Sequence, residues 1–284
     1  MGAGGRMNVT ATAEDKPLAH KRVPVSKPPF ELRDLKKAIP PHCWHRSLVR
    51  SFAALFRDFI IIGALYYLAD TFIPLLPKPL AYVAWPVYWF FQGAYLMGLW
   101  VIGHECGHHG FSEYPWLNDT IGERFQIFLT DLGVFATCYA VYRAAVIMGT
   151  QWVINIYGMP ILFMSGFFIL LTYLHHTHPS IPHYDSTEWD WLRGALATVD
   201  RNFGFLNHAF HDVTRTHTVH HLFPTIPHYH TFEAREAVKP ILGEYYKYDD
   251  TPILEAVWRE TKDCIFIEPE VVDGEKKGVY WFHK

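Results

Sequence analysis

The chain has few cysteines, no excess of positive charge and no apolar segment near its start. Its four cysteines among 284 residues form no CxxC pair, so we expect neither a disulfide framework nor a structural zinc site, and a reducing compartment is the simpler setting. The net charge of -3 excludes a typical nucleic-acid binder, which is normally basic. No apolar run precedes Pro40. We therefore expect no cleaved signal peptide, and the first membrane segment must act as the targeting signal.

Long apolar runs are what the chain does have. Hydrophobic residues make up 50% of it and aromatic residues 17%, and tryptophan and tyrosine favour membrane–water interfaces. A membrane-spanning helix needs about 20 apolar residues. We expect four such helices, at 59–76, 80–102, 132–149 and 151–174. The connections near 76–78 and 149–150 are short, so the four helices should form two hairpins.

The charge distribution orients these hairpins. Lysines and arginines are frequent in residues 1–50, and the positive-inside rule keeps such a segment in the cytosol. An even number of spans returns the chain to the same side. We predict an all-α integral membrane protein with about four transmembrane helices in two hairpins and a cytosolic helical cap. Its expected parts are a cytosolic N-terminal tail (1–50), a membrane domain (51–260) and a C-terminal tail (261–284).

Histidine is unusually frequent, with 18 residues, and most of these lie in three groups. In the first group, at 104–109, His104 and His108 are four residues apart and share a helical face, while His109 points toward a second metal. The second group, His217, His220 and His221, has spacings that place three imidazoles on one side of a helix. The third group lies at 175–178, where the fourth span meets water. Isolated histidines, such as those at 42, 45 and 230, are expected to be interfacial or surface residues.

Clustered imidazoles with nearby carboxylates suit two metal ions better than one. Imidazole binds zinc, copper, iron and nickel, and zinc hydrolases usually need only three or four protein ligands. One competing interpretation is specific. His104, Glu105 and His108 match the HExxH pattern, in which two histidines bind zinc and the glutamate is the general base. That interpretation leaves the 217–221 group unexplained, and a metal transporter would require ligands within the membrane.

Three segments resemble plant membrane fatty acid desaturases, in particular the oleate Δ12-desaturase type. They are HECGHH at 104–109, HTVHH at 217–221 and HPSIPHYDSTEWDWLRGALATVD at 178–200. Gly103, His175 and the segment 211–217 are more similar to the divergent acetylenase and epoxygenase-like members. The resemblance implies an oxygen-dependent enzyme of the endoplasmic reticulum membrane with both termini in the cytosol. Such an enzyme introduces a double bond, a triple bond or an epoxide into acyl chains of membrane phospholipid.

The same resemblance implies a cofactor and an electron donor. The cofactor is a pair of iron ions, and the donor is cytochrome b5, a separate protein here because the chain has no HPGG haem motif. The metal ligands that the resemblance assigns are His104, His108, His109, His217, His220, His221 and His176.

One part of the family pattern is missing. The family has a central box of the HxxHH type, whereas this chain has no histidine from 110 to 174. The sequence resembles an internal deletion near 122–123. We therefore expect a chain that folds around its hairpins but has an incomplete metal-ligand set and weak or no desaturase activity. Two alternatives stay open: an inactive truncated isoform that associates with a full-length desaturase, and a membrane zinc hydrolase that uses the HExxH match.

Overall fold

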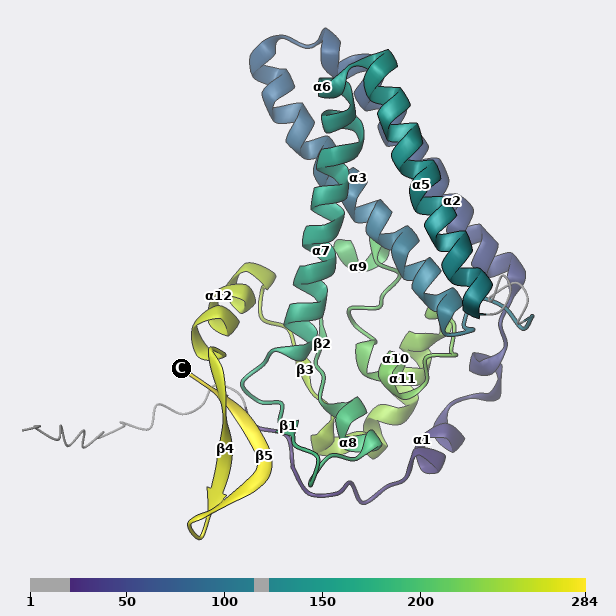
Figure 1. Ribbon diagram of the computed structural model, residues 1–284. Coiled ribbons are helices and arrows are strands. Elements are labelled where there is room, and N and C mark those ends of the chain that lie inside the picture. The colour runs from purple at the N-terminus through teal and green to yellow at the C-terminus, as the bar shows by residue number, and fades with distance from the viewer. Residues whose placement is uncertain (1–20, 115–122) are drawn as a thin grey trace, which may run out of the picture.

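The computed structural model describes residues 21–114 and 123–284 (Figure 1). Residues 1–20 of the predicted tail lie outside the described residues, and so does Gly122 at the predicted deletion. The boundaries 1–50, 51–260 and 261–284 stay predictions.

Four long helical segments lie side by side and form the upper part of the molecule in Figure 1. They are α2 (Leu48–Phe72), α3 (Lys78–Gly107), α5 (Glu123–Met148) and a composite segment of α6 (Thr150–Val153), η3 (Ile154–Gly158) and α7 (Met159–His176). The short helix η2 (Ile73–Leu75) joins α2 to α3. Gly149 joins α5 to α6 with a φ of 90°, which glycine adopts without a Cβ clash. Both connections lie at the upper end of the helical segments in Figure 1, so the predicted pairing into two hairpins agrees with this arrangement.

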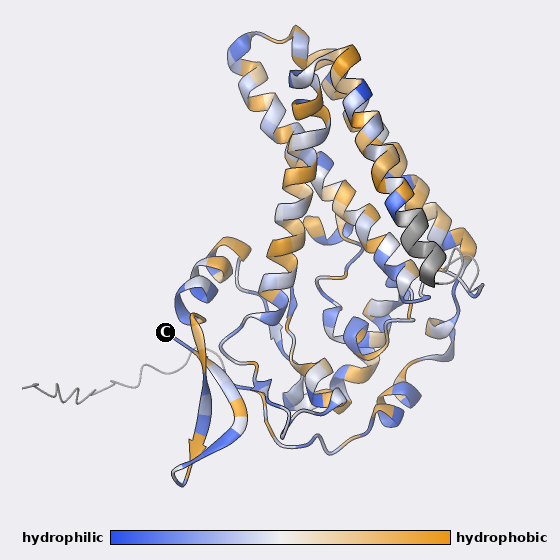
Figure 2. Ribbon diagram, viewed as in Figure 1, coloured by the Kyte–Doolittle hydropathy of each residue, from blue (hydrophilic) through white to orange (hydrophobic). Residues whose placement is uncertain are grey.

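Three segments are long and apolar enough to cross a membrane: Leu48–Leu75, Asp131–Met148 and Thr150–His176. Their apolar side chains are largely exposed, and Figure 2 shows hydrophobic residues along their surfaces. Helix α3 is the longest helix, with 30 residues, yet it is not among the three. Its tyrosines, its tryptophans and Gln92 lower its mean hydropathy, although these aromatic residues are well suited to membrane interfaces.

Polar groups at the far end of the hairpins are paired with one another. The Trp152 indole donates to Asp70 at 2.6 Å. The Trp89 indole donates to the Asn155 carbonyl at 2.9 Å, within the π-helical turn η3. A π-turn leaves backbone carbonyls outside the regular ladder, and an unpaired carbonyl in lipid costs several kcal/mol. These side chains therefore allow an irregular backbone at this depth.

Helix α3 packs very closely against α7 and α9 (Leu206–Ala209). A Cβ on Gly93 would lie 2.6 Å from the Phe163 Cβ, and a Cβ on Gly98 would lie 2.3 Å from the Ala209 carbonyl oxygen. Glycine is therefore required at both positions. The close approach brings the histidine-bearing end of α3 next to the segments that follow α7.

The lower part of the molecule is a cap of short helices, most of which surround a hydrophobic core of their own. Beyond α9, these are α1 (Leu32–Ala38), η1 (Pro41–Trp44), α8 (Trp191–Leu196), α10 (His217–Leu222), α11 (His228–Leu242), η4 (Gly243–Tyr245) and α12 (Ile253–Asp263). Leu35, Cys43, Val219 and Val238 meet in this core. Because Val219 is buried there, the histidine face of α10 turns toward α3 and α7. Ala209 of α9 and Ala256, nearer the C-terminus, pack instead in the core that α3 and α7 share.

The all-α prediction holds for most of the chain but missed two small sheets. One contains β1 (His183–Tyr184), β5 (Glu275–His283) and β4 (Phe266–Val272), in the order β1-β5-β4 with antiparallel pairing. The other pairs β2 (Asp200–Arg201) with β3 (Tyr248–Asp249) in parallel. The end of the chain is therefore a hairpin that pairs with residues just beyond α7, because its alternating apolar residues include Val279 and Trp281, which are buried.

Candidate metal centre

The first histidine group joins the end of α3 to α10. His104 Nε2 lies 3.2 Å from His108 Nε2 and 3.2 Å from His220 Nε2. His104 and His108 are one helical turn apart, so both side chains project from the same face of α3. His220 comes from a segment more than a hundred residues later. All three ligand atoms lie within 4.8 Å of one another.

The second group joins the end of α7 to the same short helix. His217 Nε2 lies 3.2 Å from His176 Nε2 and 3.1 Å from His221 Nε2. His217 and His221 are again one turn apart, and His176 is the last residue of α7. Helix α10 therefore contributes to both groups, with His220 in one and His217 and His221 in the other.

The structure brings together six of the seven predicted ligands. The exception is His109, which belongs to neither group among the described residues. Helix α3 ends at Gly107, and His109 has a φ of 58°, so the helical geometry that was expected to turn His109 toward a second metal does not extend to it. The sequence predicted that the three histidines of 217–221 share one side. In the structure that side faces two groups, which spacing alone does not distinguish.

Converging imidazole nitrogens suit a bound cation. Two nitrogens bound at about 2.0–2.1 Å to one metal lie ~2.9 Å apart at a right angle and ~3.4 Å apart at a tetrahedral angle. The observed separations of 3.1–3.2 Å fall between these values. In each group, two neutral imidazoles can share one proton in a hydrogen bond. The ring nitrogen of the third histidine then has no proton donor of its own within the group. The donor set of each group therefore fits a transition-metal ion.

Buried contacts fix the helices that carry these ligands. Asp200 Oδ1 accepts from the Thr218 backbone N–H at 2.8 Å and from its hydroxyl at 3.0 Å, in the first turn of α10. The His175 ring is fully buried, donates from Nδ1 to the Val199 carbonyl and stacks on His217 with ring centroids 4.2 Å apart. His175 thus positions a ligand rather than joining either group, a role that sequence spacing could not separate from that of its neighbour His176.

Glu105 faces away from both groups. Its carboxylate accepts from the His228 backbone N–H at 2.6 Å and from His228 Nδ1 at 2.8 Å. His228 in turn lies against His211, whose Nε2 donates to the buried Asp58 at 2.7 Å. Glu105 is therefore a link between α3 and α11, and this arrangement does not favour the HExxH role of general base.

A cavity of about 440 Å³ lies in front of both groups. All six clustered histidines line it, together with apolar side chains of α3 and α7, namely Met97, Trp100, Val101, Phe168 and Leu171. Both histidine groups contribute to the same wall. Its volume is within the range of small-molecule sites, which are mostly apolar with a few polar groups. The cavity thus places an apolar ligand beside two potential metal positions.

Burial keeps the α10 imidazoles neutral, and this predicts acid sensitivity in metal-free protein. Burial lowers the pKa of His220 to about 3 and that of His221 to about 4, and neighbouring imidazoles add to the effect. In the unfolded chain both have a pKa of about 6.5. The unfolded state therefore binds more protons as pH falls, and folding stability should decrease between about pH 6.5 and 4.

Thermal unfolding of chelator-treated protein across this pH range measures the loss of folding stability. A double variant, His220→Gln with His221→Gln, should show a shallower slope, and an unchanged slope would contradict the assignment.

In a third buried cluster, His178, Asp249 and Glu260, the possible ligand atoms also lie within 4.8 Å of one another. Here two arginines supply the positive charge. Arg201 donates to Asp249 and Glu260 at 2.6 Å each, and Arg259 donates to the same carboxylates at 2.5 and 2.6 Å. The cluster is therefore an ion network that joins β2, β3 and α12. Arg201 also donates to the Leu174 carbonyl at 2.7 Å, which fixes the end of α7 beside His176.

Comparison with known proteins identifies the family. The chain is 42% identical to an omega-6 fatty acid desaturase of the endoplasmic reticulum from Brassica juncea, with all of this chain and 99% of the relative aligned. The chain belongs to the fatty acid desaturase family. It is also 44% identical to a Delta(12) fatty acid desaturase of Calendula officinalis, with both chains fully aligned. For a Delta(12)-fatty-acid desaturase of Arabidopsis thaliana the identity is 42%, over all of this chain and 99% of the relative.

Family matches cover two segments of this desaturase-family chain. Residues 122–252 match the family described as Fatty acid desaturase, and residues 6–66 match a domain of unknown function, DUF3474. The first match contains His176 and the α10 histidines but not the 104–109 group. The alignment with the Brassica protein extends over 382 positions, 98 more than the 284 residues present here. The relatives thus contain sequence that this chain lacks, as the predicted internal deletion requires.

Proposed function

We propose that this membrane protein is an oxygen-dependent, di-iron acyl-lipid desaturase whose six clustered histidines hold the two irons. The observation that carries the proposal is the pair of three-histidine groups beside one apolar cavity. Family membership supports iron as the metal, and the relatives' names support acyl chains as the substrate class. When bound, two irons supply the activation of oxygen that breaking an unactivated C–H bond requires.

The protein's own residues would hold and orient the reactants. His104, His108 and His220 would bind one iron, and His176, His217 and His221 the other. Met97, Val101 and Leu171 line the cavity, so an acyl chain there would lose its contact with water and lie beside both metal positions. Burial of an apolar chain contributes roughly 0.8 kcal/mol per methylene group. That free energy can fix which carbons lie nearest the irons.

Three histidines per metal form a smaller ligand set than the family pattern provides. The absent HxxHH box would supply further imidazoles, so we expect each iron to be held less tightly than in complete relatives. Loss of a single outer partner of a metal ligand typically costs about 10–100-fold in affinity or activity. Activity should therefore be low and should depend on the concentration of added iron.

The topology and the partners belong to the same proposal. With α3 counted as a span, α2, α3, α5 and α6–α7 form four transmembrane segments in two hairpins. The cap and both termini would then face the cytosol on the endoplasmic reticulum membrane. Electrons would come from cytochrome b5 at the cap surface. Among residues 21–114 and 123–284, no specific contact favours a non-catalytic role beside a full-length desaturase.

Metal content and turnover test the proposal together. Purified chain reconstituted with ferrous iron should bind close to two irons and convert an oleoyl phospholipid when reductant and oxygen are supplied. Omission of either iron or oxygen should stop product formation. Binding of zinc alone, with no product at any iron concentration, would overturn the assignment.

A Glu105→Gln variant separates the desaturase from a zinc hydrolase. The glutamine oxygen can still accept from the His228 backbone N–H, and its amide can donate to His228 Nδ1. We expect iron content to be unchanged and turnover to fall less than about tenfold, whereas loss of a general base typically costs about 10²–10⁴-fold. Metal analysis and a product assay measure both quantities. Hydrolysis of the acyl ester by the unmodified chain, lost in Glu105→Gln with metal retained, would favour the hydrolase mechanism.

A further inference from the structure

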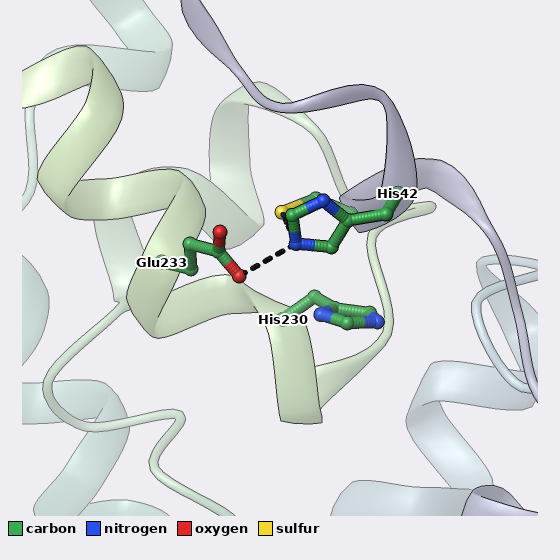
Figure 3. Close-up of side chains that lie close together, drawn as sticks. His42, His230 and Glu233 are labelled. Carbon is green, nitrogen blue, oxygen red and sulfur yellow. Dashed lines mark hydrogen bonds and ion pairs between the residues drawn. The ribbon is translucent and has the colours of Figure 1, made fainter.

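A second kind of donor cluster lies on the outside of the cap. It contains His42 and Cys43 from η1 and His230 and Glu233 from α11, and their ligand atoms lie within 4.8 Å of one another. Figure 3 shows His42 and Glu233 facing each other, with the His230 ring beside His42. His42 Nε2 donates to Glu233 Oε2 at 2.8 Å and lies 3.7 Å from Cys43 Sγ.

We propose that His42, Cys43, His230 and Glu233 form a binding site for a zinc-class divalent ion, separate from the two histidine groups, which fastens η1 to α11. The donor set of one sulfur, two imidazoles and one carboxylate is of the kind that binds tetrahedral zinc. With bonds of about 2.05 Å to nitrogen and 2.3 Å to sulfur, a tetrahedral site would separate these atoms by ~3.6 Å. The observed separation of His42 Nε2 and Cys43 Sγ is 3.7 Å.

The charges of the cluster balance such an ion. Glu233 is a carboxylate whose pKa is lowered by the hydrogen bond from His42. A bound metal would deprotonate the Cys43 thiol and displace the proton that His42 donates to Glu233. One thiolate, one carboxylate and two neutral imidazoles together neutralise a divalent cation.

One ring nitrogen of His230 lies against Arg50. Arg50 Nη1 lies 3.3 Å from His230 Nε2, and because a guanidinium can only donate, this imidazole nitrogen accepts. The arginine is exposed and its guanidinium also lies over the Tyr229 ring at 4.3 Å, a second position that it can keep when a metal binds His230. The cluster therefore differs from His178, Asp249 and Glu260, whose carboxylates are paired with the fully buried Arg201 and the partly buried Arg259.

Such an ion would act on the architecture of the cap. Tyr229 lies next to His230 and its hydroxyl accepts from the Ser47 backbone N–H at 2.6 Å, at the start of α2. His228, two residues before His230, holds Glu105 on α3. A metal between η1 and α11 would thus fix the N-terminal segment against the helix that supports the end of α3.

Cobalt binding tests the site because only a thiolate ligand gives a sulfur-to-cobalt charge-transfer band. Full-length protein in detergent, treated with a chelator and titrated with Co²⁺, should develop this band, and Zn²⁺ should remove it by displacement. Cobalt bound by the six clustered histidines would have no sulfur ligand from them and would not give this band. Cys43→Ser should abolish the band, whereas Cys106→Ser, beside the first histidine group, and the control Cys264→Ser should retain it.

Cys43 is fully buried, so Cys43→Ser can fail to fold. A second variant tests the site in that case. Glu233 is about half exposed, so Glu233→Gln should fold normally and weaken cobalt binding by at least about 10-fold, the lower cost of losing a ligand's partner. Zn²⁺ should raise the unfolding temperature of the unmodified chain more than that of Glu233→Gln. Absence of the band at saturating cobalt, its persistence in Cys43→Ser or its loss in Cys106→Ser would overturn the proposal.

Discussion

A His220→Ala variant should lose iron from the first histidine group and lose at least about 100-fold of its turnover of acyl lipid. His220 is the only ligand that α10 gives to this group, and its removal leaves His104 and His108 alone. Because loss of an outer partner of a ligand already costs about 10–100-fold, loss of a direct ligand should cost more. Iron content per chain and initial rates at saturating reductant measure the two effects.

The matched control is His208→Ala. His208 is exposed, lies on α9 and belongs to neither group among the described residues, so iron content and rate should change little. His221→Ala removes a ligand from the other group and should lower the rate as much as His220→Ala. If both irons act as one unit, the double variant should be no worse than either single variant, because effects within a unit are not additive. Retention of two irons by His220→Ala would refute the ligand assignment.

An Arg201→Met variant should lose about 3–5 kcal/mol of folding stability, the usual cost of breaking a buried ion pair. The Arg201 side chain has no exposed surface, and its partners Asp249 and Glu260 are 4% and 0% exposed. With Arg201 absent, two buried carboxylates share the single guanidinium of Arg259. Thermal unfolding in detergent, followed by loss of helical circular dichroism, measures the change. His176 should also bind metal more weakly, because Arg201 holds the Leu174 carbonyl at the end of α7.

Two comparisons make this prediction specific. Arg215→Met breaks an ion pair with Asp212 whose side chains are about one-third exposed, so it should cost less than about 1 kcal/mol. Adding Glu260→Gln to Arg201→Met leaves one carboxylate with one guanidinium. The double variant should therefore be more stable than Arg201→Met alone. Equal losses in Arg201→Met and Arg215→Met would show that the buried network does not stabilise the fold.

The sequence alone was sufficient for the features that depend on local spacing. Long apolar runs predicted the hydrophobic helices, and the glycine at 149 marked the turn between α5 and α6. The four-residue spacings predicted which side chains share a face, so His104 pairs with His108 and His217 pairs with His221. The motifs at 104–109, 178–200 and 217–221 predicted the family that the comparisons show.

The spacing of residues along the sequence could not predict contacts between distant segments. His42 and Glu233 are 191 positions apart, so an isolated histidine at position 42 was interpreted as a surface residue. The network of Arg201 with Asp249 and Glu260 likewise joins distant segments, and each of its charges looks ordinary in the sequence. The local hairpin of β4 and β5 was also missed, although only Asp273 and Gly274 separate its strands, and the pairing of β5 with β1 joins segments almost a hundred positions apart.

The sequence by itself determined the hydrophobic hairpins, the histidine pairs within single helices and the family of this protein. These follow from periodicity and from residue type, which are properties of neighbouring positions. Only the tertiary structure decided that His220 joins the α3 group, that His176 joins the other group and that Glu105 turns toward His228. Those outcomes depend on how α3, α7 and α10 pack around buried side chains such as Met97 and Val219, and helical spacing carries no information about the distance between helices.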